Sequence, residues 1–419
     1  FTARTLGGLI YQCGVLNHDC GSEAELKRRA TAAYRAFRCR KLAILERILC
    51  ALFGFIFSGK CCKKNTLMYV RENYALENKA FKSHPDSEVK IIPPIEMIGV
   101  WDTVSAMGFP IKEISDFINV VIYRFKFENQ DLAENVARGC HALSIDDERK
   151  TFHPLLWNEN EETQSTIQQV WFAGVHANVG GGYPKHGMSL VTLDWMLHKA
   201  GETDLLFNTH DHENFTEHQN VNDKLYDSRA GVKSIYRYTP RNIGPLCARH
   251  GVTPRIHLSA FQRIAQSTEG YAPGNVPNTL EVVENTGNTP TCQAVQKLMR
   301  ESLDMTPSLL SKVGAEIALR ITTHIAQLAI LFFLFAMYLV DNSSNADIWT
   351  VIMGLFSVNG LIARVVYAIK QYWWLIVAAI LLYIASSLAE SRMKTIFSEF
   401  YHGLLKRLRK IFDLTNESV

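Results

Sequence analysis

The sequence predicts an α/β domain, with a parallel sheet flanked by helices, followed by C-terminal transmembrane helices. Two apolar runs, at residues 95–101 and 169–175, have the length and composition of buried parallel strands. Around them, helical patterns alternate with Gly, Pro and Asn turns over residues 1–312, as in soluble α/β domains. From about residue 313 onward the chain is dominated by apolar helix, which predicts a membrane region.

The N-terminal end has a helical pattern from its first residues. Phe1 to Tyr11 look like the middle of a helix and no signal peptide is visible, so we expect the chain to be a fragment that starts inside its domain. A second helix is predicted from Ser22, which is an N-cap residue. It leads into the apolar stretch Ile48–Phe57, which is too short to span a membrane. This stretch is interpreted either as an interfacial lid or as a helix packed over the sheet.

The composition excludes several classes of protein and of site. A formal net charge of +3 is too small for a nucleic-acid-binding protein, whose surface carries a dominant basic stripe. The nine cysteines include no C-x-x-C pair, so we expect reduced thiols and no zinc ribbon. His210, His212 and His218 could ligate a metal, but their Asn-, Thr- and Glu-rich surroundings predict a solvated loop. Neither a metal nor a cofactor is predicted.

Two charge-free segments are the predicted membrane spans, Ile321–Val340 and Tyr372–Ala389. Between them, Val351–Ile369 contains Arg364, and an arginine at the bilayer centre costs about 2.5–3.5 kcal/mol on insertion. That segment is a third span, a re-entrant piece or an interfacial helix. The alternative to any span is a set of buried helices in a soluble domain.

The predicted domains are therefore residues 1–312, a membrane region over 313–392 and a basic tail over 393–419. The positive-inside rule places the basic tail in the cytoplasm. With two spans the domain over 1–312 lies on the same side, and with three it does not. The tail's charge comes from Lys406, Arg407, Arg409 and Lys410.

A carboxylate and an imidazole follow directly after the two predicted strands. Asp102 follows the first strand and His176 the second, and working residues of open α/β sheets lie just beyond the carboxyl ends of strands. Acid before histidine is the chain order of α/β-hydrolases, in which the serine comes first. Asp102 alone could equally cap the next helix or turn, and a lone histidine at a glycine turn is no stronger evidence of catalysis. Gly180, Gly181 and Gly182 lack the spacing of a phosphate loop and are expected to let the backbone turn beside His176.

At these residues the sequence resembles the α/β-hydrolase domain of type VI secretion phospholipase effectors and their uncharacterised relatives. The resemblance covers roughly residues 1–285, and its motifs occur in order. It implies that Asp102 is the acid and His176 the general base of a Ser-Asp-His triad, whose serine would lie upstream of Phe1. Family members often carry Asp where this chain has Asn178. The matching stretches are Phe1–Ile10, Gly99–Val104, Ala142–Arg149, Phe152–Trp157, Trp171–His176 with Gly180–Tyr183, Asp227–Arg229, Tyr236–Tyr238 and Ile256–Ser259.

The resemblance implies an incomplete α/β-hydrolase fold and a carboxylic-ester hydrolase, lipase- or phospholipase-like, with acyl esters or phospholipids as substrates. We expect the intact parent to be active at the membrane and residues 1–419 alone to be inactive, because the nucleophile is absent. Two alternatives stay open. One is a non-catalytic, membrane-tethered interaction protein on a hydrolase scaffold. The other is a secreted antibacterial lipase effector with an unknown immunity or secretion partner.

Overall fold

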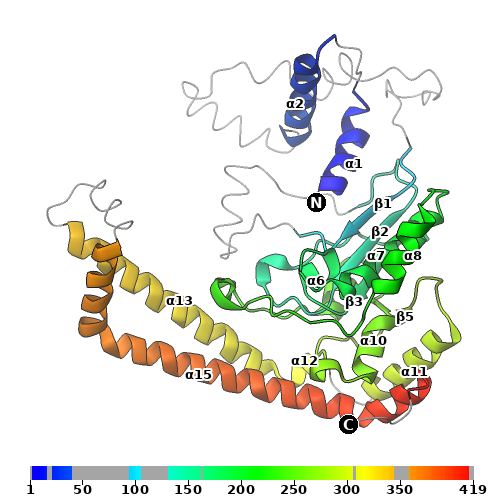
Figure 1. Ribbon diagram of the computed structural model, residues 1–419. Coiled ribbons are helices and arrows are strands. Elements are labelled where there is room, and N and C mark those ends of the chain that lie inside the picture. The colour runs from blue at the N-terminus through cyan, green and yellow to red at the C-terminus, as the bar shows by residue number, and fades with distance from the viewer. Residues whose placement is uncertain are drawn as a thin grey trace.

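A computed structural model describes residues 2–16, 21–39, 94–104, 131–160, 162–163, 165–304, 308–343 and 358–414. The strands lie centrally, and two long helices near the C-terminus extend together away from them (Figure 1). The predicted interfacial stretch Ile48–Phe57 lies outside the described residues.

The centre of the domain is a five-stranded sheet in the order β1-β2-β3-β4-β5. Every neighbouring pair is parallel, which confirms the predicted α/β class. β1 and β3 are the two strands expected from the sequence, and β2 lies between them. The strands are β1 (Ile98–Trp101), β2 (Gly139–Ser144), β3 (Ile167–Phe172), β4 (Arg255–His257) and β5 (Glu281–Val283).

Helices cover both faces of the sheet, as the continuous apolar strands require. Along β3, Val170 and Phe172 pack with Trp195 of α7 (Gly187–Gly201), whereas Trp171 belongs to the core of the opposite face. Successive strand residues point to opposite faces, so this alternation buries the strand on both sides. On the opposite face lie α10 (Leu258–Ala265) and α11 (Pro290–Asp304).

Both helices predicted near the N-terminus are present. α1 (Thr2–Cys13) packs on β1 at Gly7, where an added Cβ would lie 2.6 Å from Ile98. α2 (Glu23–Cys39) begins after Ser22, whose Oγ accepts the Glu25 N–H at 3.3 Å. The remaining helical elements are η2 (Lys150–Phe152), α6 (His176–Gly180), α8 (Thr209–His218), η3 (Gly231–Ile235), α9 (Ile243–Ala248), η4 (Thr268–Gly270) and α12 (Leu309–Lys312).

The prediction that the histidine cluster lies in a loop is wrong, because the structure has a helix there. His210 and His218 lie in α8, which Asn208 caps by accepting the His210 N–H at 3.2 Å. The capping bond and packing against α7 stabilise this helix despite the weak helix propensity of its Asn, Thr and His residues. Within the described part of the chain, no three His, Cys, Asp or Glu side chains are grouped to hold a metal ion.

The C-terminal region is an antiparallel pair of helices, α13 (Gly314–Ser343) and α15 (Val358–Ile411). Arg320 pairs with Glu390 at 2.9 Å near the domain, and Phe333 contacts Tyr372 at the far end. α15 bends at Tyr372, whose φ of −122° is not helical. Two segments, Gly314–Leu334 and Gln371–Ile411, are long and apolar enough to cross a membrane.

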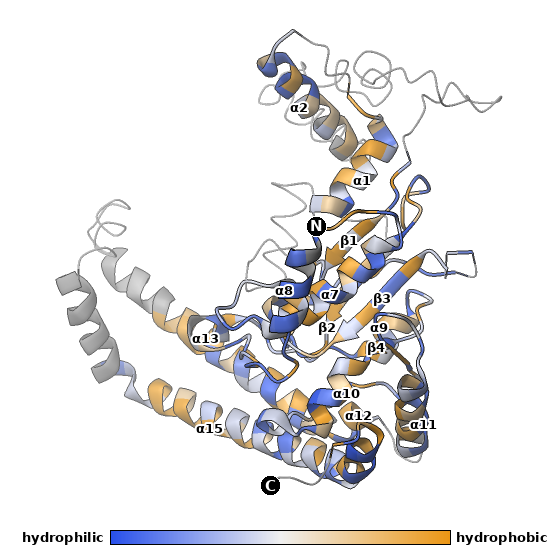
Figure 2. Cartoon of the chain, turned by 45° about the vertical axis from the view of Figure 1, so that its right-hand side comes forward, coloured by the Kyte–Doolittle hydropathy of each residue, from blue (hydrophilic) through white to orange (hydrophobic). Residues whose placement is uncertain are grey.

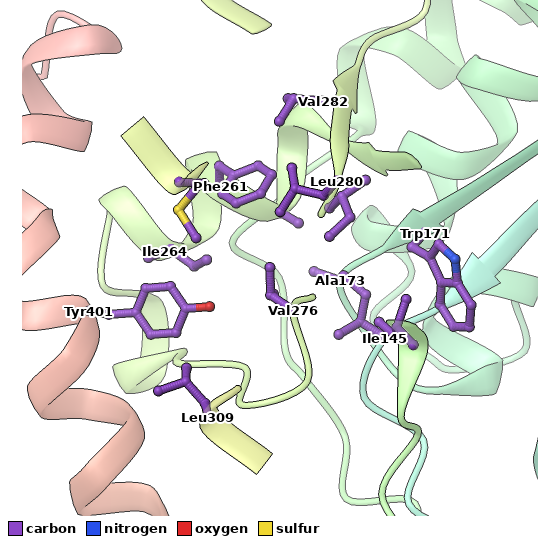
Figure 3. Packing of buried hydrophobic residues seen from close by; sticks show 14 of the residues in the cluster. Ile145, Trp171, Ala173, Phe261, Ile264, Val276, Leu280, Val282, Leu309 and Tyr401 are labelled. Carbon is purple, nitrogen blue, oxygen red and sulfur yellow. The ribbon is translucent and has the colours of Figure 1, made fainter. Parts of the chain in front are cut away.

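α15 is divided into two unlike halves. Its last turns enter the domain core, where the Tyr401 ring faces Ile264 and Val276 (Figure 3) and its hydroxyl donates to the Pro273 carbonyl at 2.9 Å. Between Trp373 and Leu388, α15 instead carries large apolar side chains that are exposed, and orange hydrophobic residues recur along this part away from the domain (Figure 2). The stretch treated in the sequence as a separate basic tail thus continues α15, and Leu408 at its end is fully buried.

Candidate active site

Asp102 is placed by a sharp turn at the end of β1. Its N–H still donates to the Ala142 carbonyl at 2.7 Å, as a strand residue would, but its φ is +37°. Few non-glycine residues adopt such a conformation, and strain of this kind concentrates at functional sites. The turn directs the carboxylate along the carboxyl edge of the sheet, where it is completely buried.

His176 begins α6, four residues after β3 ends. Its Nδ1 lies 2.7 Å from Asp102 Oδ2, and the two residues therefore form a dyad across the width of β2. The imidazole is 32% exposed whereas the carboxylate is 0% exposed. Among the described residues no group hydrogen bonds to Nε2, so the ring offers one nitrogen to the acid and one to solvent.

Strand β2, which the sequence analysis did not identify, supplies further partners for the acid. Ser144 at its carboxyl end donates its N–H to Asp102 Oδ1 at 3.0 Å and its hydroxyl to Oδ2 at 3.2 Å. His141 in the same strand accepts the Thr103 N–H at Nε2, 3.0 Å away. Burial lowers the pKa of His141 to about 3, so the ring is neutral and remains an acceptor.

Arg241 is the strongest partner of the acid and was missed by the sequence analysis. Its Nη1 lies 2.6 Å from Asp102 Oδ1 and its Nη2 2.8 Å from Oδ2, in a bidentate pair with both side chains fully buried. Burial by itself would raise the pKa of Asp102, but the charge and hydrogen bonds of Arg241 outweigh it and hold that pKa far below its usual range. Arg241 is remote in sequence and belongs to no catalytic motif, so only the fold brings it here.

The segment after β2 holds the histidine turn in place. Asp146 accepts the Gly174 N–H at 2.6 Å, and Asp147 accepts the His176 N–H at 3.2 Å. Asp147 is itself paired with Arg149 at 2.6 Å, and the Arg149 guanidinium lies over the Phe152 ring that contacts His176 edge-on. These contacts assign a positioning function to the Ala142–Arg149 motif.

Asn178 stabilises the same turn through two hydrogen bonds. Its Oδ1 accepts the Val175 N–H at 3.3 Å, and its Nδ2 donates to the Lys224 carbonyl at 3.0 Å. A carboxylate could accept the first bond but could not donate the second. The predicted glycine turn beside the histidine is present, since Gly181 and Gly182 have φ of +85° and +109°.

The start of α1 lies beside the acid. Arg4 donates to the Leu155 carbonyl at 2.5 Å, and the Leu155 N–H donates to the Thr103 carbonyl at 2.7 Å. Its guanidinium also lies 4.5 Å from the ring centre of Trp157. Hydrogen bonds therefore connect the first turn of α1 to the backbone next to Asp102.

A cavity of about 740 Å³ lies close to the dyad. It lies behind the dyad, between the segment around Tyr271 and the face of α15 around Lys394, and it includes Asp147, Val175 and Arg241 in its wall. Neither Asp102 nor His176 lines this cavity.

Comparison with known proteins gives one family match. Residues 1–199 match the family model described as T6SS, phospholipase effector Tle1-like, catalytic domain. No curated protein and no solved structure matches the chain significantly. The matched residues contain Asp102, Ser144 and His176 but end before Arg241. Residues 1–199, just under half of the chain, are therefore similar to the T6SS Tle1-like phospholipase effector catalytic domain.

Proposed function

We propose that Asp102 and His176 are the acid and the general base of a serine hydrolase that cleaves carboxylic esters of phospholipids. The observation that carries this proposal is the 2.7 Å contact between His176 Nδ1 and a fully buried carboxylate, in a ring whose other edge is accessible. The phospholipase effector family supports the lipid substrate and a role as a T6SS effector.

The dyad has the arrangement that serine-dependent ester hydrolysis requires. His176 Nε2 takes the proton of a serine hydroxyl as its oxygen attacks the ester carbonyl carbon, while Asp102 accepts the Nδ1–H and stabilises the imidazolium. The proton then passes to the oxygen of the departing alcohol as the C–O bond breaks. A water molecule then gives its proton to His176 and attacks the acyl-enzyme. The carboxylic acid leaves, and the proton returns to the serine oxygen.

We place the serine before Phe1, in the turn that leads into α1. In α/β-hydrolases the nucleophile lies on a strand-to-helix turn, with the helix running back along the sheet. α1 packs on β1, and Arg4 in its first turn is fastened next to the acid, which supports this placement. Residues 1–419 without the preceding segment should then show no ester turnover.

A fluorophosphonate probe tests the proposal on the protein with its preceding segment. We expect covalent labelling of one serine, and loss of phospholipid turnover in His176→Ala and Asp102→Asn. His218→Ala, the same change in helix α8, is the matched control and should keep full turnover. Absence of labelling, or unchanged turnover in His176→Ala, would refute the enzyme and favour a non-catalytic scaffold.

We further infer that part of the helix pair enters a lipid bilayer. This hairpin arm comprises α13 from Ile325 onward and α15 from Gln371 to Leu388. From Ile325 to Ser343, α13 is about 28 Å long at 1.5 Å per residue, close to the roughly 30 Å of a bilayer core. Large apolar side chains on the arm are exposed to 43% or more: Ile325, Leu331, Phe332, Phe333, Trp373, Trp374, Val377, Ile380, Leu381, Tyr383, Ile384 and Leu388.

The antiparallel arrangement supports placing both ends of the arm on one side of the membrane. The basic residues after it are bound to the domain, since Arg409 donates to the Ala265 carbonyl at 2.9 Å and Arg407 pairs with Glu301 at 3.0 Å. The positive-inside rule then favours a cytoplasmic domain.

Flotation with phosphatidylcholine vesicles tests the membrane proposal. Phe332→Glu with Leu381→Glu, at two exposed positions of the arm, should abolish co-flotation because charged groups are expelled from hydrocarbon. Leu206→Glu, at a 94% exposed leucine outside the arm, is the matched control and should float as the native protein does. Unchanged flotation of the double variant would refute the assignment.

A further inference from the structure

We propose that Arg241 is a positioning residue of the site: it neutralises the buried carboxylate of Asp102 and fixes the plane in which that carboxylate meets His176. This inference rests on the proposed function but goes beyond the residues that the family model matches, which end at residue 199. Its basis is the bidentate pair between two fully buried side chains.

The Arg241 guanidinium is held from two sides. Besides Asp102, its Nη1 donates to the Ser144 carbonyl and its Nη2 to the Phe152 carbonyl, each at 2.5 Å. Ser144 also donates twice to Asp102, and the Phe152 ring contacts His176. The planar guanidinium thus donates to four acceptors, the two carboxylate oxygens and two backbone carbonyls. This arrangement allows the carboxylate only one orientation, which a lysine ammonium could not impose.

The charge of Arg241 has a separate effect from its geometry. A buried carboxylate without a partner would be protonated more readily, and a protonated acid is a poorer acceptor for the Nδ1–H of a positive imidazolium. The titratable and charged groups that act on Asp102 are Arg241, His176 and His141, and Asp146 and Asp147 act on Arg241. Among the described residues, Arg241 is the only permanent cation that hydrogen bonds to Asp102.

A double-mutant cycle in residues 1–419 tests the charge pairing without requiring turnover. Arg241→Met leaves a buried carboxylate and Asp102→Asn leaves a buried guanidinium, so each should lower the urea midpoint of unfolding. The double variant leaves no unpaired charge buried. Its urea midpoint should therefore be at least as high as that of the less stable single variant. Arg263→Met, at another fully buried arginine of the domain, is the matched control and should show additive effects with Asp102→Asn.

The pH dependence separates pairing from packing. In the native protein the pKa of Asp102 is held low, so the pair stabilises the fold above the carboxyl's unfolded pKa and this contribution is lost as the pH falls. In Arg241→Met, burial without the cation should raise the pKa of the acid above its unfolded value, so the variant regains stability as the pH falls from 8 towards that value. The stability difference between native and variant should therefore be larger at pH 8 than at pH 4.5. A purely structural arginine would give a difference that does not change with pH.

Activity of the protein with its preceding segment gives the second measurement. We expect Arg241→Met to lose about 100-fold or more in kcat, with little change in KM, as for a misplaced catalytic group. In Arg241→Met the acid limb of the pH–rate profile should move to higher pH. Arg241→Lys should return that limb to its native position but restore only part of kcat. Additive behaviour in the cycle, or a pH-independent loss, would overturn the proposal for Arg241. Unchanged turnover in His176→Ala would overturn the proposed function instead.

Discussion

The division of α15 into a core half and an exposed half can be tested with one chemical change at two positions. Leu408 is 0% exposed and lies in the core cluster with α10 and α11, whereas Leu388 is 59% exposed on the arm. Both lie in α15, so Leu→Ala changes helix propensity equally at the two sites.

The expected magnitudes follow from burial. Leu408→Ala removes three buried carbons, worth about 2.4 kcal/mol at roughly 0.8 kcal/mol each. The cavity left behind brings the cost into the range of about 2–5 kcal/mol observed for such changes. At Leu388 most of the side chain is already exposed, so Leu388→Ala should cost about 1 kcal/mol or less.

Urea unfolding in a mild detergent that covers the arm measures the difference. We expect a clearly lower midpoint for Leu408→Ala at an unchanged slope, and a midpoint near the native one for Leu388→Ala. Equal effects of the two substitutions would refute the division of α15. So would a cost below about 0.5 kcal/mol at Leu408, which is typical of surface positions.

Two further predictions concern the segments that hold the histidine turn. Burial raises the pKa of Asp146 to about 6 from 3.8, so its contribution to stability falls as the pH rises through that window. Asp146→Asn mimics the protonated acid and should flatten thermal stability over this range, and an unchanged slope would contradict the raised pKa. At Gly174, φ is +118° and an added Cβ would lie 2.5 Å from Asn178 Cβ. Gly174→Ala should therefore lower the melting temperature more than Gly182→Ala, whose φ is also positive but whose surroundings are open; equal losses would argue against the close contact.

The sequence predicted those parts of the fold that depend on local pattern. Continuous apolar runs identify buried parallel strands, and β1 and β3 were found in this way. Short β4 and β5, with three residues each, carry no such pattern, and their pairing depends on neighbours distant in sequence. α8 was missed for a related reason, since its residues have weak helix propensity and its packing against α7 depends on the fold.

For the candidate site, the sequence by itself determined that a carboxylate and an imidazole follow strand ends, because residue type and order are local properties. Only the tertiary structure decided that Asp102 and His176 lie 2.7 Å apart across β2. It also decided that Arg241, 139 residues beyond the acid, neutralises it. Likewise, hydrophobicity predicted apolar C-terminal helices, but the fold decided which half of α15 is buried. Burial and ion pairing depend on what packs opposite a side chain, and no pattern along the chain specifies that.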